Sequence, residues 1–377
     1  MRLLGLLAAA GVACAQDLPR GQIIADVKCT ADPTQSYALY LPSNYTPDRA
    51  WKVLFAFDPG ARGRLPVERY QAPAERYGYI VAGSNNSRNG PWDRSFAAAD
   101  AMWSDVFSRF SIDERRVYAT GLSGGSRVAL AVALRTGRIA GVIASSAGFP
   151  DAKPRTSVPF AIFETAGVDD FNNLEMRDVN RPLTSPHHLA IFEGGHEWPP
   201  AAVAAEAVDW LEIQAMRAGL RERDETLIGH IFETYQARSA SAPDTMIRYR
   251  VLNALAADFA GLRDVTWITQ EAAGLQQSKE YRDASKKERE LEQSERRRRA
   301  ELEQLVAGLV ADPAVRRSNL DDLKPRLTDI ARQARAPQDS SERQMARRLL
   351  GEVMVESREI RDNELQELLE KLRTPKK

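Results

Sequence analysis

Short, strongly apolar stretches alternate with segments of helical periodicity through the first 220 residues. The apolar stretches are "SYALYLP", "WKVLFAFD", "YGYIVAGSN", "RVYATGLS", "GVIASSAG", "VPFAIFETAG" and "HHLAIFEGG". We expect helices between them, near residues 65–77, 94–110, 125–135, 173–183 and 200–218. Because strands that alternate with helices form mostly parallel sheets with helices on both faces, the pattern predicts an α/β fold.

Beyond Gly219 the pattern changes to a charged, helical one, rich in Glu, Arg, Leu, Gln and Ala. Residues 286–303 interleave acidic and basic side chains three and four positions apart, which is typical of an exposed helix. The interleaved glutamates would repel phosphates, so the four-arginine run 296–299 favours a solvated helical face over a nucleic-acid site.

The last segment carries an apolar stripe at helical spacing, which needs a partner. That partner is another helix of this region, the α/β domain or a second chain, so we keep protein partners or self-association as an expectation. The stripe comprises Met345, Leu349, Leu350, Val353, Ile360, Leu365, Leu368 and Leu372.

The N-terminus has the features of a secretory signal peptide. Arg2 precedes an apolar stretch over residues 3–13, and Ala13-Cys14-Ala15 matches the small-x-small cleavage pattern. We therefore predict a signal peptide at 1–15, a catalytic α/β domain at 16–218 and a charged helical module at 219–377, in a secreted or periplasmic protein. A lipid anchor on Cys14 and a buried N-terminal element are the alternatives.

Composition narrows the function classes. The 52 basic and 52 acidic residues of the 377-residue chain cancel, so no global field indicates a nucleic-acid or anionic-membrane partner. We expect no transmembrane span in the mature chain. Loss of Cys14 would leave Cys29 as the only cysteine, so disulfides would not stabilise the fold.

The sequence Gly121-Leu122-Ser123-Gly124-Gly125 follows a predicted strand and leads directly into a predicted helix. A G-x-S-x-G motif in that context predicts a sharp turn that exposes a nucleophilic serine. The glycines at its two ends would let strand and helix approach without side-chain clashes. Ser123 is therefore the candidate nucleophile.

A serine nucleophile needs a histidine base, which works best when a carboxylate orients it. Later strands end at Gly167-Val168-Asp169-Asp170 and at Gly194-Gly195-His196. The order Ser123, Asp170, His196 therefore predicts a catalytic triad, with Asp169 as the alternative acid.

An acyl-transfer site also needs N–H donors for the oxyanion. The amide of Gly124 directly follows the nucleophile, and the loop at residues 58–63 offers Ala61, since Pro59 lacks an N–H. Asn89, Trp92 and Trp198 follow strand ends, where open α/β sheets bind ligands. Each tryptophan is either a substrate contact or a packing residue.

The segments "YALYLPSNYTPD", "IDERRVYATGLSGGS" and "GGHEWPP" resemble secreted, lidless α/β-hydrolase esterases grouped with polyhydroxybutyrate depolymerases, feruloyl esterases and dienelactone hydrolase-like proteins. The resemblance covers about residues 36–218 and implies an α/β-hydrolase fold. It implies the triad Ser123, Asp170 and His196, with Gly124 and Ala61 as oxyanion donors. Pro59-Gly60 stands where such esterases often have His-Gly.

These features predict a serine hydrolase that cleaves small-molecule or polymer esters through an acyl-enzyme, without a metal or organic cofactor. Two alternatives stay open. One is a serine peptidase with the same triad, and the other is a hydrolase-like interaction scaffold with vestigial activity.

Overall fold

The computed structural model describes residues 18–360 and 362–373. The expected signal peptide and Cys14 lie outside them, so cleavage and lipidation stay predictions. The chain divides into two compact units, one up to Ala140 and the other from Gly141, and each is described by itself. The predicted domain limits at 16–218 and 219–377 stay predictions.

The first unit is built on five strands whose buried faces hold the core. β2 pairs with β1 and β4 in antiparallel orientation, whereas β3 pairs in parallel with β4 and β5. The β3 and β4 runs are buried along almost their entire length, as expected for strands covered on both faces. The elements are β1 (Ile23–Lys28), β2 (Ser36–Tyr40), β3 (Trp51–Phe57), α1 (Arg64–Tyr77), β4 (Tyr79–Ser84), α2 (Trp92–Arg109), β5 (Ile112–Leu122) and α3 (Gly124–Thr136).

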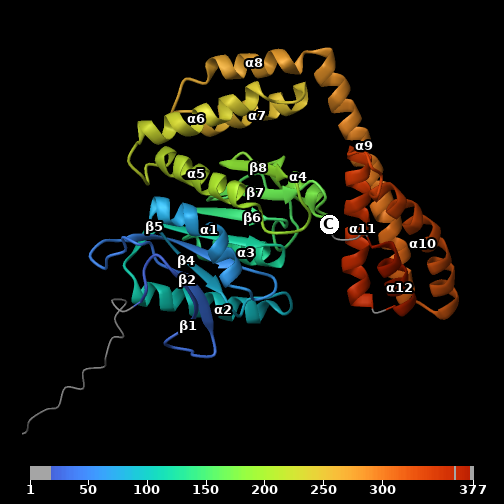
Figure 1. The fold of residues 1–377 in the computed structure, drawn as a ribbon, viewed down its shortest axis with the longest axis horizontal. Coiled ribbons are helices and arrows are strands. Elements are labelled where there is room, and N and C mark those ends of the chain that lie inside the picture. Colours follow the sequence, from blue (N-terminus) through green and yellow to red (C-terminus); the bar gives the residue numbers. More distant parts are fainter. Residues whose placement is uncertain (1–17, 361, 374–377) are drawn as a thin grey trace, which may run out of the picture. The chain divides into compact units, whose positions relative to one another are not determined.

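The second unit begins with three parallel strands, β6 to β8, each paired with the next. The strand order is β1-β2-β4-β3-β5 in the first unit and β6-β7-β8 in the second (Figure 1). The predicted α/β-hydrolase fold with a mostly parallel sheet and a helical C-terminal region is confirmed. These elements are β6 (Gly141–Ser145), β7 (Ala161–Gly167), α4 (Asn173–Asn180), β8 (His187–Phe192) and α5 (Ala201–Arg217).

The helices that follow α5 form two apolar clusters. The first joins the end of α5 to α6 (Glu225–Ala240), α7 (Thr245–Phe259) and α8 (Thr266–Gln276). The second joins the end of α9 (Lys279–Ala307) to α10 (Pro313–Ala334), α11 (Ser341–Ile360) and α12 (Asn363–Leu372). The predicted C-terminal stripe packs in this second cluster, against Leu320, Leu323 and Leu327 of α10. Its partner is therefore another helix of the same region.

Over residues 18–360 and 362–373, no helix combines the length and the apolar character that crossing a bilayer requires.

Cys29 is a free, buried cysteine. Burial, reinforced by the nearby carboxylate of Asp105, raises the pKa of the Cys29 thiol to about 11. This thiol is therefore protonated at neutral pH and unreactive.

A buried polar group joins β8 to the first helical cluster. His188 Nδ1 lies 2.9 Å from Asp258 Oδ2 on α7, and the indole N–H of Trp210 on α5 donates to Asp258 Oδ1 at 2.6 Å. Burial disfavours the imidazolium, but the charge and hydrogen bond of Asp258 outweigh burial and raise the pKa of His188. Glu206 raises this pKa further, whereas Arg238 lowers it.

This pair makes the stability of the second unit depend on pH. Because the pKa of His188 is higher in the folded than in the unfolded state, protonation of His188 stabilises the fold. This stabilisation is complete below the unfolded pKa of about 6.5 and is lost as pH rises through the folded pKa. We expect Asp258→Asn to destabilise the protein by about 3 to 5 kcal/mol at pH 6, and by less at high pH. Denaturant unfolding from pH 5.5 to 9 measures this, with His187→Gln as the control. Parallel wild-type and Asp258→Asn stability curves would contradict it.

Candidate active site

Ser123 occupies a strained turn between β5 and α3. Its backbone has φ 54° and ψ −125°, a conformation that non-glycine residues rarely adopt. A Cβ on Gly121 would lie 2.1 Å from the Gly125 carbonyl oxygen, and one on Gly125 would lie 2.0 Å from that of Phe57. Both positions therefore require glycine, as the G-x-S-x-G motif predicts. The turn places Ser123 at the positive N-terminal end of α3.

Two loops of the first unit lie against this turn. A Cβ on Gly124 would lie 1.9 Å from Asn89 Oδ1, so the Asn89 side chain covers the residue that follows the nucleophile. The Asn89 amide donates to the Pro59 carbonyl at 2.9 Å, and Gly60 forms an isolated β-bridge with Arg88. The loops after β3 and β4 thus meet at the start of α3, where a polar substrate group could be bound.

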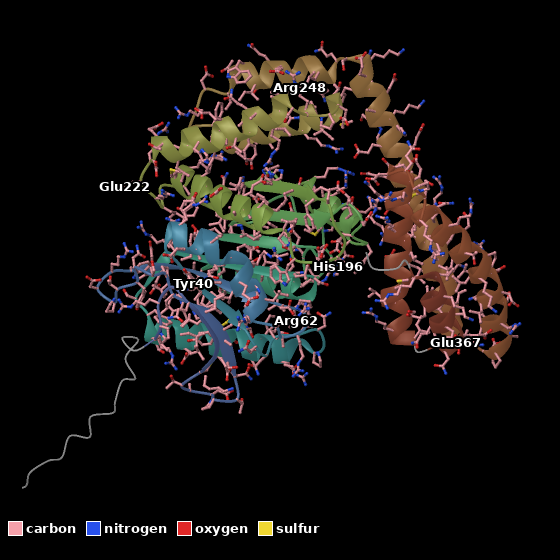
Figure 2. All side chains as sticks on the ribbon, viewed as in Figure 1. Tyr40, Arg62, His196, Glu222, Arg248 and Glu367 are labelled. Atoms are coloured by element: carbon pink, nitrogen blue, oxygen red, sulfur yellow. The ribbon has the colours of Figure 1, made fainter. Side chains whose placement is uncertain are left out.

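The two predicted oxyanion donors differ in their surroundings. Gly124 begins α3, directly after Ser123. Ala61 has φ 58°, and its amide donates to the Asp58 carbonyl at 3.2 Å. The buried Asp58 carboxylate further fixes this loop by accepting from the Gly60 amide and from Arg62, which is labelled in Figure 2, both at 2.8 Å. Donation by Ala61 to an oxyanion would therefore require it to share its N–H.

His196 is oriented by a carboxylate. Its Nδ1 lies 2.8 Å from Oδ1 of Asp170, which is fully buried and also accepts from the Asn172 amide at 2.9 Å (His196 is labelled in Figure 2). The alternative acid, Asp169, instead forms an ion pair with Arg347 at 2.7 Å. The structure therefore brings Asp170, rather than Asp169, to the histidine. With Nδ1 bonded, Nε2 is the atom available to accept a proton.

The loops that carry Asp170 and His196 are packed tightly together. A Cβ on Gly167 would lie 2.3 Å from the Gly194 carbonyl oxygen, and the Asp169 amide donates to that same oxygen at 2.9 Å. The Phe171 ring stacks on the His196 imidazole, with centroids 4.0 Å apart and planes 25° apart. The imidazole is thus held at its Nδ1 edge and on one face.

The two candidate pocket tryptophans have different exposure. Trp198 is 5% exposed, which indicates a packing role. Trp92 is the first residue of α2, is 41% exposed and stacks on Phe96. Of the two, Trp92 is the one that an external ligand could contact.

One group of carboxylates among the described residues has a spacing that could hold a metal ion. Glu303, Glu352 and Glu356 form a group whose ligand atoms lie within 4.8 Å of one another. Glu352 already forms an ion pair with Arg299, and such acidic groups are common without a metal. We assign no metal to them.

The sequence did not reveal that arginines of the C-terminal helices reach the loop of Asp170. Arg299, Arg347 and Arg348 all donate to residues of this loop. The run 296–299 is predicted to be a solvated helical face, and Arg296 keeps a 44% exposed side chain while it pairs with Asp178. Arg299 differs, because its side chain is only 19% exposed and donates to the Phe171 carbonyl. Charge alternation predicts the helix but does not identify the contacts of its individual arginines.

Comparisons with known proteins give weak structural similarities. No known family and no curated protein matches the sequence. Similar solved structures include a thermostable esterase (TM-score 0.40, 18% identity, 50% of this chain and 62% of that one). A ferulic acid esterase has a TM-score of 0.41 and 14% identity, over 50% of this chain and 97% of that one. S-formylglutathione hydrolase from Staphylococcus aureus has a TM-score of 0.39 and 15% identity, over 50% of this chain and 97% of that one. The chain thus spans less than two thirds of the thermostable esterase.

Proposed function

We propose that this protein is a serine hydrolase that cleaves carboxylic esters through an acyl-enzyme intermediate. The observation that carries the proposal is the 2.8 Å hydrogen bond between His196 and the buried carboxylate of Asp170. Such a bond holds a histidine in the tautomer that can deprotonate a serine. The strained backbone of Ser123 supports the proposal further, because strain of this kind is typical of functional residues.

Each group has a defined role in the proposed reaction. His196 Nε2 removes the Ser123 proton while Oγ attacks the ester carbonyl, and Asp170 stabilises the resulting imidazolium. The Gly124 amide stabilises the oxyanion, and Ala61 is the second proposed donor. The C–O bond to the alcohol then breaks, and His196 protonates the leaving alcohol. A water molecule then attacks the acyl-enzyme carbonyl in the same way, with His196 as the base. The bond to Ser123 Oγ breaks, which releases the carboxylic acid and restores Ser123.

Labelling with a fluorophosphonate tests this proposal, because only an activated serine displaces fluoride from the reagent. We expect one label per folded chain, located on Ser123 by peptide mapping. A heat-denatured sample is the control and should remain unlabelled. Label on another serine, or none on a folded sample, would refute the proposal. Rates on an activated ester and on a matched anilide then distinguish esterase from peptidase activity.

A further inference from the structure

The loop that carries Asp170 is held by arginines from outside the sheet. We call residues 168–171 the acid loop. Arg348 Nη1 donates to the Val168 carbonyl and Arg347 Nη1 donates to the Asp169 carboxylate, both at 2.7 Å. Arg299 Nη2 donates to the Phe171 carbonyl at 2.8 Å. Three of the four residues of the loop are thus bound by helices α9 and α11.

These arginines are themselves fixed in place. Arg348 forms two hydrogen bonds with Glu295, at 2.8 and 2.5 Å, and both side chains are buried. Arg299 pairs with Glu352, and Arg347 Nε donates to the Ala334 carbonyl at 3.1 Å. Burying an ion pair is costly and contributes little net stability compared with an apolar pair. We therefore infer that these ion pairs place the acid loop precisely rather than increase the stability of the fold.

An apolar contact extends the same connection to the histidine. A Cβ on Gly351 of α11 would lie 3.6 Å from Phe171 Cδ1, an ordinary packing distance, so Phe171 packs against the helix. The same ring stacks on His196. Helix α11 thus contacts the acid loop through two arginines and supports the imidazole through Phe171.

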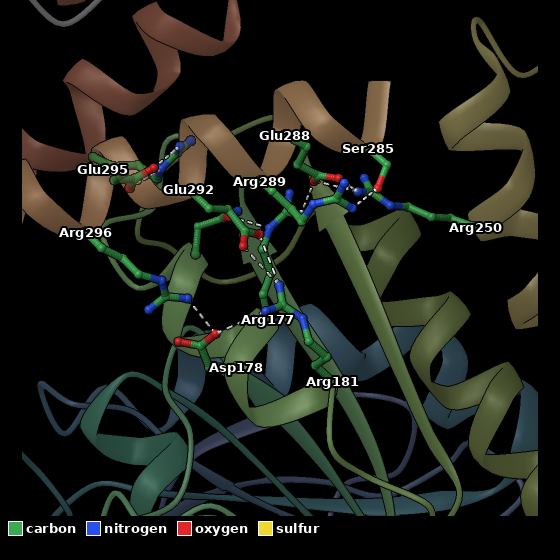
Figure 3. Close-up of polar contacts among 12 residues, drawn as sticks. Arg177, Asp178, Arg181, Arg250, Ser285, Glu288, Arg289, Glu292, Glu295 and Arg296 are labelled. Atoms are coloured by element: carbon green, nitrogen blue, oxygen red, sulfur yellow. Dashed lines mark hydrogen bonds and ion pairs between the residues drawn. The ribbon is translucent and has the colours of Figure 1, made fainter. Parts of the chain in front are cut away.

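A separate set of ion pairs attaches α9 to α4 (Figure 3). Arg177 pairs with Glu288 at 2.8 Å, and Arg296 pairs with Asp178 at 2.7 Å. None of these four residues belongs to the acid loop. The Arg296 pair is more than two-fifths exposed at both side chains, and exposed pairs of this kind typically contribute about 0 to 1 kcal/mol. The Arg296–Asp178 pair therefore attaches α9 to α4 without contacting the acid loop. Its removal serves as a control.

We propose that Arg299, Arg347 and Arg348 are positioning residues that hold Asp170 where it orients His196, so that the C-terminal helices support the catalytic site. This inference rests on the proposed function. The arginines do not touch the reacting atoms and act through the acid loop. An Asp170 that moved by about 1 Å would misalign the imidazole, and a displacement of that size can cost about 100-fold in rate.

The test compares Arg347→Gln with Arg296→Gln in the full-length chain. Each variant removes one arginine that pairs with an aspartate at 2.7 Å, but only Arg347 pairs with the acid loop. For an activated ester, we expect Arg347→Gln to lower kcat roughly 10-fold to 100-fold while KM stays within about twofold. Arg296→Gln should leave both within about twofold. Arg347→Lys should recover part of kcat, because its ammonium can still pair with Asp169.

Proton NMR, read together with the melting temperature, distinguishes displacement of Asp170 from general loosening of the fold. A histidine Nδ1–H bonded to a carboxylate gives a strongly downfield resonance. We expect this resonance in the wild type and in Arg296→Gln, and its shift or broadening in Arg347→Gln at unchanged melting temperature. An unchanged resonance and kcat in Arg347→Gln would overturn the positioning role. A wild-type protein that shows the resonance but neither takes the fluorophosphonate nor cleaves esters would instead refute the proposed function.

Discussion

Ser123→Ala should abolish ester turnover, with a fall in kcat of at least about 10,000-fold, while the protein remains folded. The oxygen that forms the acyl-enzyme is lost, and nothing else at the turn changes. Alanine and serine have similar difficulty at φ 54°, so the backbone strain is retained and the melting temperature should be nearly unchanged. Steady-state kinetics together with thermal melting measures both quantities.

Ser123→Gly is the matched control for this experiment. Glycine also lacks the nucleophile, but it adopts positive φ without strain. We therefore expect Ser123→Gly to be equally inactive yet more stable than Ser123→Ala, by up to about 1 to 3 kcal/mol once the flexibility of glycine is offset. Ester hydrolysis above background by either variant would contradict the assignment of the nucleophile.

Asp170→Asn should lower kcat by about 10,000-fold with little change in KM. The Asp170 oxygen that faces His196 also accepts the Asn172 amide hydrogen bond, so an asparagine would keep its oxygen there or turn its NH₂ group toward the imidazole. In both cases the side chain carries no charge to stabilise the imidazolium. An NH₂ group facing Nδ1 would in addition favour the tautomer whose Nε2 already bears a proton.

Asp169→Asn is the control for this substitution. It removes a neighbouring carboxylate whose partner is Arg347 rather than His196, so we expect a much smaller loss of kcat, no more than about 100-fold. Kinetics of the two variants on one activated ester compares them directly. A loss in Asp169→Asn equal to that in Asp170→Asn, or a fully active Asp170→Asn, would remove Asp170 from the role of catalytic acid partner.

The sequence predicts the fold well where the apolar pattern is strong. All seven expected strands and five expected helices of the α/β part are present, with small differences at their ends, such as α2 beginning at Trp92 rather than near residue 94. The missed strand, β1, has a different character. It lies at the end of the sheet order, pairs only with β2 among the described strands and is largely exposed. An edge strand of this kind lacks the apolar run that reveals buried strands.

The candidate site is harder to predict from the sequence than the fold. Motif context indicates Ser123 and His196 and favours Asp170, but it leaves Asp169 open as the alternative acid. The choice depends on which carboxylate turns toward the imidazole, and the structure places Asp170 there. The arginines of the acid loop gave no local signal, because they lie in charged helices 128 to 180 residues away from their partners.

That separation along the chain has a consequence for biosynthesis. The acid loop leaves the ribosome about 180 residues before Arg348, and at roughly 5 to 20 residues per second this delay lasts roughly 10 to 40 s. Once His196 has also emerged, the nascent chain carries the proposed nucleophile, acid and base without the arginines that hold the acid loop. We therefore expect the proposed hydrolytic activity to reach its full level only after the chain has been translated beyond Arg348.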